Sequence, residues 1–368
     1  MKKIKLKVVT KNNNYPIIIG SGISKNIPKL LNENSINFSK CLLIIDKKIP
    51  SIFIKKIIDS FHNKKIISFF FNASEKNKNQ KSVNDLLKIL LINNFHRNDC
   101  IISIGGGITG DVSGFVASIF KRGIKFINVP TTLLAQVDSS IGGKTGINSK
   151  YGKNLIGSFY QPSLVVSDIN FLKTLPKREI FCGYGEILKH SLISSRKNFT
   201  FLDKNASKIL NLDSPYIEKS IYQSCLIKKK IIELDEKENN LRKVLNFGHT
   251  FAHSYEAALG YSKKLNHGEA VLLGIISATT FSLNNQLLSK KEFLLIKKHF
   301  IKYNLIHHLN TIFSKDKLNK LISFMKKDKK NNDNRINLVL LKKIGKPIYN
   351  LTFSDKNLKK FIKKQLTN

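Results

Sequence analysis

The sequence predicts an N-terminal α/β domain with a parallel sheet, followed by a mainly helical, all-α domain. Through the first half of the 368 residues, short β-branched runs alternate with helical patterns, which is typical of a parallel sheet. One of these runs leads into a glycine-rich turn before a helix. After LPKRE, residues 175–179, strand-like runs nearly vanish and long helical patterns follow. We therefore expect two domains, 1–176 and 177–368, a division that suits the chain length.

The expected elements follow from residue periodicity. Helices predicted from apolar residues recurring at three and four cover 49–61, 81–95, 110–120, 181–193 and 245–261. The apolar stretch AVLLGIISATTFSL falls short of the ~20 residues of a membrane span, so we expect it to be a core helix. The predicted strands are 3–9, 15–20, 41–46, 66–71, 100–105 and 125–130.

The chain is strongly basic, with 63 Lys+Arg against 25 Asp+Glu and a formal net charge of +38. Such a charge suggests nucleic acid, an anionic membrane surface or an acidic substrate as a partner. However, the lysines are spread along the whole chain among asparagine and isoleucine, whereas a nucleic-acid footprint should cluster. The sequence therefore favours a compositional bias, with neither nucleic acid nor membrane as a partner.

The four cysteines form no CxxC pair and no pattern typical of a small disulfide-bonded domain. This favours a reducing compartment. The opening MKKIKLKVVTKNNN is basic but has no apolar segment behind it, so no secretory signal is expected. Together these features predict a cytoplasmic protein.

The segment CIISIGGGITGD, residues 100–111, reads as a buried strand that runs into a glycine loop and a helix. Gly105, Gly107 and Gly110 match GxGxxG, a weak pattern by itself. Glycines let the backbone approach a phosphate, and the helix N-terminus offers N–H groups to the anion. The acidic residue expected about 20 positions later is missing. The sequence predicts a Rossmann-like sheet with a pyrophosphate cradle but without the ordinary dinucleotide-binding order; a purely structural turn is the alternative.

The stretch 129–162 is rich in small and polar residues directly after a predicted strand. Loops at the carboxyl ends of parallel strands are where α/β proteins bind ligands. We expect this stretch to meet a polyhydroxylated, phosphorylated ligand, and an ordinary surface loop is the alternative. The side chains that could reach such a ligand are Thr131, Thr132, Asp138, Lys144, Lys153 and Asn154.

Two helical segments in the second half carry further candidates. Glu186 and Lys189 share a helix face, a spacing that by itself is typical of a solvated ion pair. His249 and His253 stand four apart, as in HExxH metal sites, but without the intervening glutamate. A catalytic zinc usually takes three protein ligands. Spacing alone favours His249, His253 and either Glu256 or His267.

Taken together, these motifs resemble the 3-dehydroquinate synthase family. The matching stretches occur in the family's order over about residues 70–330, and the long VPTTLLAQVDSSIGGKT block is highly specific. They are GGGITGD, KRGIKFINVPTTLLAQVDSSIGGKTGIN, GKNLIGSFYQP, LKTLPKRE, GEILKH, LNFGHTFAH and HGEAV. The family usually has DGExxK after the strand at 66–71, where this chain has ASEKNK and keeps only Glu75 and Lys78 of that motif.

The resemblance implies a ligand set for one divalent metal, zinc or cobalt, made of Glu186, His249 and His267, with His253 facing the substrate. It implies an NAD site at Glu75, Lys78, Gly107, Ile108, Thr109, Gly110, Asp111, Thr131, Thr132, Lys144, Lys153, Phe171, Leu172, Lys173 and Thr174. It implies substrate or catalytic roles for Arg122, Lys144, Lys153, Asn154, Lys189, Arg242, Asn246, His253, and Lys329 or Lys330.

The implied reaction converts 3-deoxy-D-arabino-heptulosonate 7-phosphate to 3-dehydroquinate and phosphate. It proceeds by NAD-mediated transient oxidation, phosphate β-elimination, re-reduction, ring opening and an intramolecular aldol closure. The family is usually dimeric, so a homodimer is expected. Two alternatives stay open: a metal-dependent polyol dehydrogenase of the same fold, and a basic nucleic-acid-binding protein. The second leaves the glutamate, the histidines and the glycine loop without a purpose.

Overall fold

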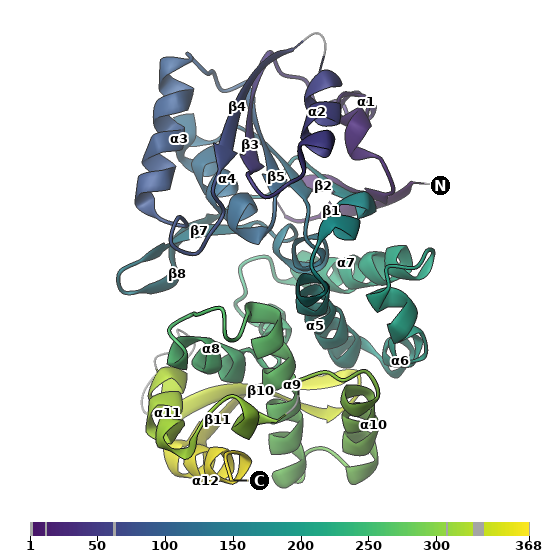
Figure 1. Cartoon of the computed structure of the whole chain (residues 1–368), viewed down its shortest axis with the longest axis vertical. Coiled ribbons are helices and arrows are strands. Elements are labelled where there is room, and N and C mark those ends of the chain that lie inside the picture. Colours follow the sequence, from purple (N-terminus) through teal and green to yellow (C-terminus); the bar gives the residue numbers. More distant parts are fainter. Residues whose placement is uncertain (1–2, 12, 62–63, 307, 327–334, 368) are drawn as a thin grey trace. The chain divides into compact units, whose positions relative to one another are not determined.

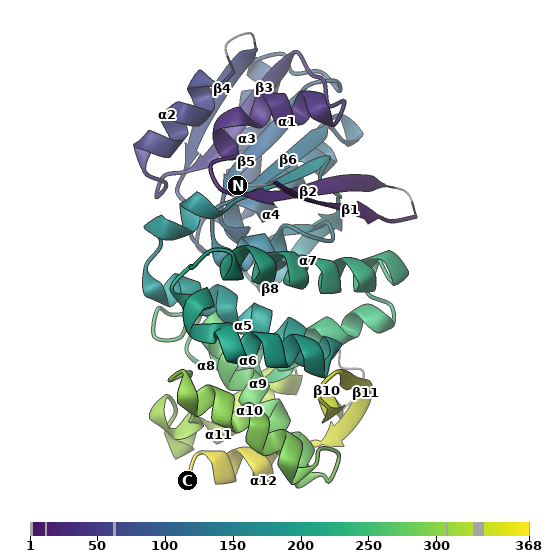
Figure 2. The same cartoon turned by 90° about the vertical axis from the view of Figure 1, so that its right-hand side faces the viewer.

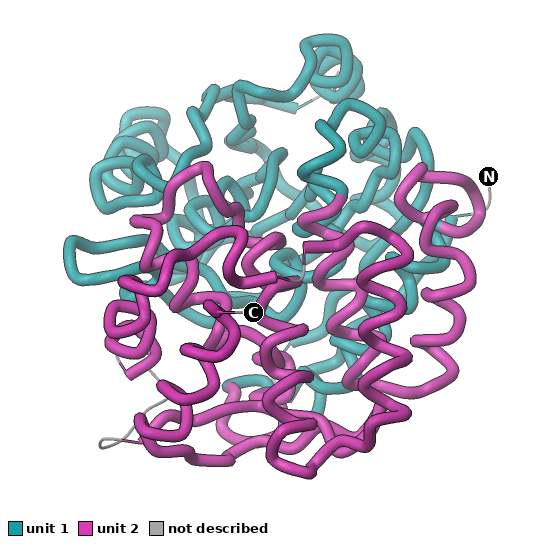
Figure 3. The backbone as a smooth tube through the Cα atoms, turned by 60° about the horizontal axis from the view of Figure 1, so that its bottom comes forward, with its two compact units in different colours: residues 1–180, 217–237 teal, residues 181–216, 238–368 magenta. Residues whose placement is uncertain are grey.

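The computed structural model describes residues 3–11, 13–61, 64–306, 308–326 and 335–367. It divides into two compact units, coloured separately in Figure 3. The first comprises residues 1–180 and 217–237, and the second comprises residues 181–216 and 238–368. The predicted domains, 1–176 and 177–368, stay a prediction.

The first unit is built on a seven-stranded sheet in the order β1-β2-β9-β6-β5-β3-β4. Its strand pairs are parallel except β1 with β2, which are antiparallel at one edge (Figure 2). The parallel α/β fold predicted from the sequence is thus present. The strands are β1 Ile4–Val9, β2 Asn14–Gly20, β3 Lys40–Asp46, β4 Lys65–Phe71, β5 Cys100–Gly105, β6 Lys125–Pro130 and β9 Leu164–Asp168.

Helices cover both faces of this sheet (Figure 1). The central strands β3 and β5 are apolar on both faces, as expected of strands buried from two sides. One core cluster packs α1 and α2 against them, and a second packs α3 and α4 on the other face. The helices are α1 Ile27–Glu33, α2 Ser51–Asp59, α3 Gln80–Ile92, α4 Gly107–Ile119 and α7 Tyr216–Leu234.

Several elements of the first unit escaped the sequence prediction. The stretch predicted to meet a ligand contains an antiparallel hairpin, β7 Lys144–Ser149 and β8 Gly152–Phe159, where a loop was expected. Its glycines and polar residues hid the strand pattern, because most of β8 is exposed and buries little apolar surface. The strand β9 has only five residues, too few for its period to stand out.

The second unit is mainly helical, as predicted. Its helix α9 begins at His267 after the N-cap Asn266, which forms a capping box: the Asn266 side chain accepts from the backbone N–H of Glu269 at 2.9 Å. A hairpin, β10 Arg335–Lys343 and β11 Lys346–Ser354, was not predicted. The helices are α5 Lys177–Ser194, which begins in the first unit, α6 Arg196–Leu210, α8 His249–Ala258, α9 His267–Asn284, α10 Lys290–Lys302, α11 Leu318–Lys326 and α12 Asp355–Gln365.

Two further expectations bear on the core. All four cysteines are buried free thiols, and burial raises the pKa of Cys225 to about 12. The predicted core helix over 270–283 is α9, whose side chains are buried nearly throughout. Among the described residues, no helix combines the length and apolar character needed to cross a membrane.

Candidate active site

The glycine loop joins β5 to α4 and lies directly against the segment after β6. The backbone N–H of Thr131 donates to the carbonyl oxygen of Gly105 at 2.9 Å. A Cβ atom added at Gly107 would lie 2.9 Å from Ser139 Oγ, so a side chain there would require Ser139 to shift. The N-cap of α4 is Gly106, which makes no side-chain cap. The backbone N–H groups of the first turn can therefore serve an anion, as the sequence predicts.

The ASEKNK loop is fixed to the glycine-loop helix by ionic contacts. The Lys78 side chain is nearly buried, and its Nζ donates to Asp111 Oδ2 at 2.5 Å and to Asn154 Oδ1 at 2.6 Å. Glu75 lies 3.2 Å from Lys153 Nζ. The structure thus brings together four residues of the implied NAD site, Glu75, Lys78, Asp111 and Lys153, although the loop lacks the family's aspartate and glycine.

Replacing Lys78 by methionine is expected to lower the free energy of unfolding at pH 7 by about 2–3 kcal/mol, because it leaves Asp111 largely buried without this cation. Burial already raises the pKa of Asp111 above its ordinary 3.8, and Lys78 opposes that rise. In the variant the folded carboxyl binds its proton more tightly than the unfolded one. The loss should therefore shrink as the pH falls from 7 towards about 4.

Urea unfolding at pH 7 and at pH 4.5 measures this effect. The matched control is Lys78→Met combined with Asp111→Asn, which removes the ionisable carboxyl and should recover most of the lost stability at pH 7. Equal stability of the Lys78→Met variant and the unmodified chain at pH 7 would contradict the electrostatic account.

Other predicted residues of the first unit lie after β9 and after α4. The side chains of Phe171 and Leu172 are buried in the core, while Lys173 and Thr174 beside them are exposed. Arg122 follows the last turn of α4. At 1.5 Å per residue, the 13 residues of α4 separate Arg122 by roughly 20 Å from the glycine loop. This distance concerns the glycine loop only, and the role of Arg122 as a substrate or phosphate contact stays a prediction.

Lys228 is a candidate ligand-binding residue that the sequence patterns did not indicate. Its nearly buried Nζ donates to the Asp138 carbonyl oxygen at 2.5 Å and to Asp138 Oδ1 at 2.8 Å. Asp138 belongs to the polar stretch predicted to meet the ligand. The only sequence signal was a lysine run in a helix, which resembles the general lysine background of this chain. The contact with Asp138 singles Lys228 out.

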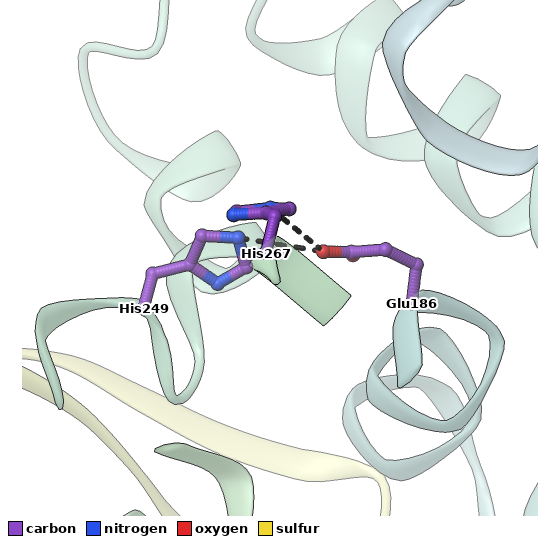
Figure 4. Close-up of side chains that lie close together, drawn as sticks. All are labelled: Glu186, His249 and His267. Atoms are coloured by element: carbon purple, nitrogen blue, oxygen red, sulfur yellow. Dashed lines mark ion pairs between the residues drawn. The ribbon is translucent and has the colours of Figure 1, made fainter. Parts of the chain in front are cut away.

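In the second unit, Glu186, His249 and His267 converge from α5, α8 and α9 (Figure 4). His249 Nε2 lies 3.5 Å and His267 Nε2 lies 3.8 Å from Glu186 Oε1. The ligand atoms of the three side chains lie within 4.8 Å of one another. Two imidazole nitrogens and a carboxylate are a donor set that fits zinc or cobalt.

Two close backbone approaches hold the three helices of this cluster together. A Cβ atom at Gly268 would lie 2.2 Å from the Cα of Cys182, which places the start of α9 against α5. Gly248, with a φ of +80°, precedes α8, and a Cβ atom there would lie 2.8 Å from the backbone N of Ile275 in α9. The left-handed φ also favours glycine at 248. Glycine at these contacts brings the cluster's side chains within reach of one ion.

Two of the three side chains of the cluster, Glu186 and His249, are buried. Burial, followed by the charge of Lys189, lowers the pKa of His249 to about 4, so this ring is neutral at pH 7, the form that binds a metal. Lys189 Nζ forms an ion pair with Glu186, and both side chains are buried. The spacing alone predicted a solvated ion pair, and this prediction is wrong. Helix packing buries this face of α5, a fact that the spacing does not contain.

The neighbours of the cluster include further predicted residues. The His253 ring is 5.4 Å from that of His249 and 6.4 Å from that of His267, but its side chain is exposed and is not among the three convergent residues. Asn246 Nδ2 donates to Glu238 Oε1 at 2.6 Å in the segment before α8. Arg242, in the same segment, is almost fully buried. Lys329 and Lys330 lie outside the described residues.

Solved structures with this fold include those of two synthases. A 2-deoxy-scyllo-inosose synthase complexed with carbaglucose-6-phosphate, NAD⁺ and Co²⁺ matches with a TM-score of 0.88 at 24% identity, covering 98% of this chain and 100% of that one. The 2-epi-5-epi-valiolone synthase of Streptomyces hygroscopicus, with NAD⁺ and Zn²⁺ bound, matches with a TM-score of 0.86 at 22% identity, covering 98% of each chain. The chain therefore has the fold of the sugar phosphate cyclases.

Sequence comparison narrows this class to one family. Residues 68–182 match the family model for the N-terminal part of 3-dehydroquinate synthase, and residues 183–331 match that for its C-terminal part. The 3-dehydroquinate synthase of Pelagibacter ubique is 63% identical over 367 residues, which cover 100% of both chains. The chain belongs to the 3-dehydroquinate synthase family, as its motifs suggested.

Proposed function

We propose that this chain converts 3-deoxy-D-arabino-heptulosonate 7-phosphate to 3-dehydroquinate and phosphate. Full-length identity of 63% to a 3-dehydroquinate synthase supports this reaction. The structural observation that carries the proposal is the convergence of Glu186, His249 and His267 from three helices. A nucleic-acid-binding role rests on the net charge alone and leaves this cluster unexplained.

Glu186, His249 and His267 would hold one divalent metal ion, zinc or cobalt. The glycine loop at residues 107–111, with Thr131 and Thr132, would hold NAD, supported by the anchored loop that carries Glu75 and Lys78. When bound, the metal supplies Lewis acidity and NAD supplies reversible hydride transfer. NAD⁺ with Co²⁺ or Zn²⁺ in the two cyclase structures supports both cofactors.

The chain's own side chains would bind and orient the substrate. Lys189 has a buried ammonium beside Glu186. It can bind an oxygen anion of the substrate, which would compete with the Glu186 carboxylate for this positive charge. His253 is exposed next to the cluster and can exchange a proton with a ligand there. The substrate's carboxylate and phosphate would be held by cations and amides drawn from Arg122, Lys144, Lys153, Asn154, Arg242 and Asn246.

The reaction is tested by mixing the chain with the heptulosonate phosphate, Zn²⁺ or Co²⁺, and substoichiometric NAD⁺. We expect phosphate to exceed NAD⁺ many times over, with no lasting absorbance at 340 nm, because the hydride returns to the product in each turnover. A polyol dehydrogenase of the same fold would instead accumulate NADH without phosphate. That outcome would reject the synthase.

The remaining parts of the proposal concern partners and location. We propose a homodimer in the cytoplasm, in line with the family's biosynthetic role, with no nucleic-acid or membrane partner. The dispersed lysines support the absence of a nucleic-acid partner, because they form no concentrated basic stripe in the sequence.

A further inference from the structure

We propose that Glu256 is a positioning residue that aims His267 at the metal. This inference rests on the metal role proposed above for Glu186, His249 and His267. Glu256 was an alternative metal ligand on sequence spacing. Its contact in the structure assigns it a different task.

The two nitrogens of the His267 ring face different carboxylates. Nδ1 lies 3.0 Å from Glu256 Oε2, while Nε2 lies 3.8 Å from Glu186 Oε1. Glu256 therefore contacts the nitrogen that points away from the cluster. It is itself only 5% exposed and belongs to α8, whereas His267 is the first residue of α9. The carboxylate is held by one helix and orients a ring on another.

His267 depends on this contact more than His249 depends on its own. The His249 side chain is 11% exposed and its Nδ1 lies 3.3 Å from the carbonyl oxygen of Phe247, so packing and the local backbone fix that ring. The His267 side chain is 34% exposed and stands at a helix start. Without Glu256, this partly exposed ring loses a contact that holds its Nε2 towards Glu186.

The contact also selects the chemical form of His267. A carboxylate next to Nδ1 accepts that N–H, which leaves the lone pair on Nε2, the nitrogen nearer the cluster. The negative charge makes Nε2 a stronger donor to a cation. Glu256 thus acts on orientation, tautomer and basicity at once, without binding the metal itself.

The test measures Zn²⁺ affinity of the metal-free full chain by competition with a chromophoric chelator. Glu256→Ala should weaken binding by about tenfold to a hundredfold, the usual effect of losing such a partner. Glu256→Gln should lose less, because its amide oxygen can accept the same hydrogen bond without the charge. In the Co²⁺-loaded chain, Glu256→Ala should also change the visible absorption of the ion, since one ligand is no longer held in place.

Asp203→Asn is the matched control. Asp203 Oδ1 lies 2.7 Å from His299 Nδ1 in the same unit, a second carboxylate–histidine pair outside the metal cluster. This variant should bind Zn²⁺ as the unmodified chain does. Unchanged Zn²⁺ affinity of both Glu256 variants, in a chain that binds Zn²⁺ and turns over substrate, would overturn the role of Glu256 alone. An unmodified chain that bound neither Zn²⁺ nor Co²⁺ would overturn the proposed function and this inference together.

Discussion

Replacing His249 or His267 by alanine is expected to empty the metal site, whereas replacing His253 leaves it filled. Nε2 of each of the first two rings lies within 4 Å of Glu186 Oε1, while the exposed His253 is not among the convergent ligand atoms. Losing one of three protein ligands should lower Zn²⁺ affinity by several orders of magnitude and abolish phosphate release. His253→Ala should keep about one Zn²⁺ per chain and lower turnover about 10²–10⁴-fold, the range for a lost proton-transfer group.

Zinc content after dialysis, measured beside phosphate release, separates these roles. His299→Ala serves as a control for removing a buried imidazole from the same unit, because His299 contacts Tyr184 and Asp203 rather than the cluster. If His253→Ala lost zinc as completely as His249→Ala, the assignment of three ligands would be wrong.

Gly268→Ala should damage the same site without touching a ligand. The added Cβ would lie 2.2 Å from the Cα and 2.4 Å from the carbonyl oxygen of Cys182, and a backbone cannot rotate away. The start of α9 and the adjoining turn of α5 must move apart, which separates His267 from Glu186. We expect a loss of about 3 kcal/mol in the free energy of unfolding. Zn²⁺ affinity should fall about 100-fold, since ligand geometry tolerates only about 0.5 Å.

The matched control is Gly185→Ala, at the same contact between α5 and α9. A Cβ atom there would lie 3.1 Å from the Gly268 carbonyl oxygen and 3.3 Å from Leu272 Cγ, which calls for a shift of only a few tenths of an ångström. Alanine also favours a helix over glycine by up to about 1 kcal/mol, so the net change should be small. Equal stability and equal Zn²⁺ affinity of the two variants, measured by urea unfolding and chelator competition, would show that the close approach is unimportant.

Much of the first unit could be predicted from the sequence because its strands are buried on both faces. Runs such as 41–46 and 100–105 are mostly apolar and almost fully buried, and this signal survives in a single sequence. The hairpin at 144–159 could not be found this way, because its strands are rich in polar and glycine residues. The antiparallel pairing of β1 with β2 also escaped, since residue pattern does not specify strand direction.

The candidate metal site also could not be predicted from residue patterns in a single sequence. Helical spacing indicated His249 and His253 as a pair of metal ligands, but such spacing describes residues within one helix only. Glu186, 63 positions before His249, joins the cluster through the packing of α5 against α9, which single-sequence periodicity does not contain. Motif resemblance supplied that long-range link. Neither route found the contact between Lys228 and Asp138, or the place of Glu256 behind His267.

The buried ion pair of Glu186 and Lys189 bears on the order in which this protein is assembled. A carboxylate withdrawn from water without a cation would cost several kcal/mol. Lys189 supplies that cation from within the same helix, so we expect the helical unit to fold without an ion. Small zinc domains differ, because they are unfolded until the metal arrives. Here a nascent chain can reach its folded form first and acquire its ion afterwards, from whatever supply the cell offers.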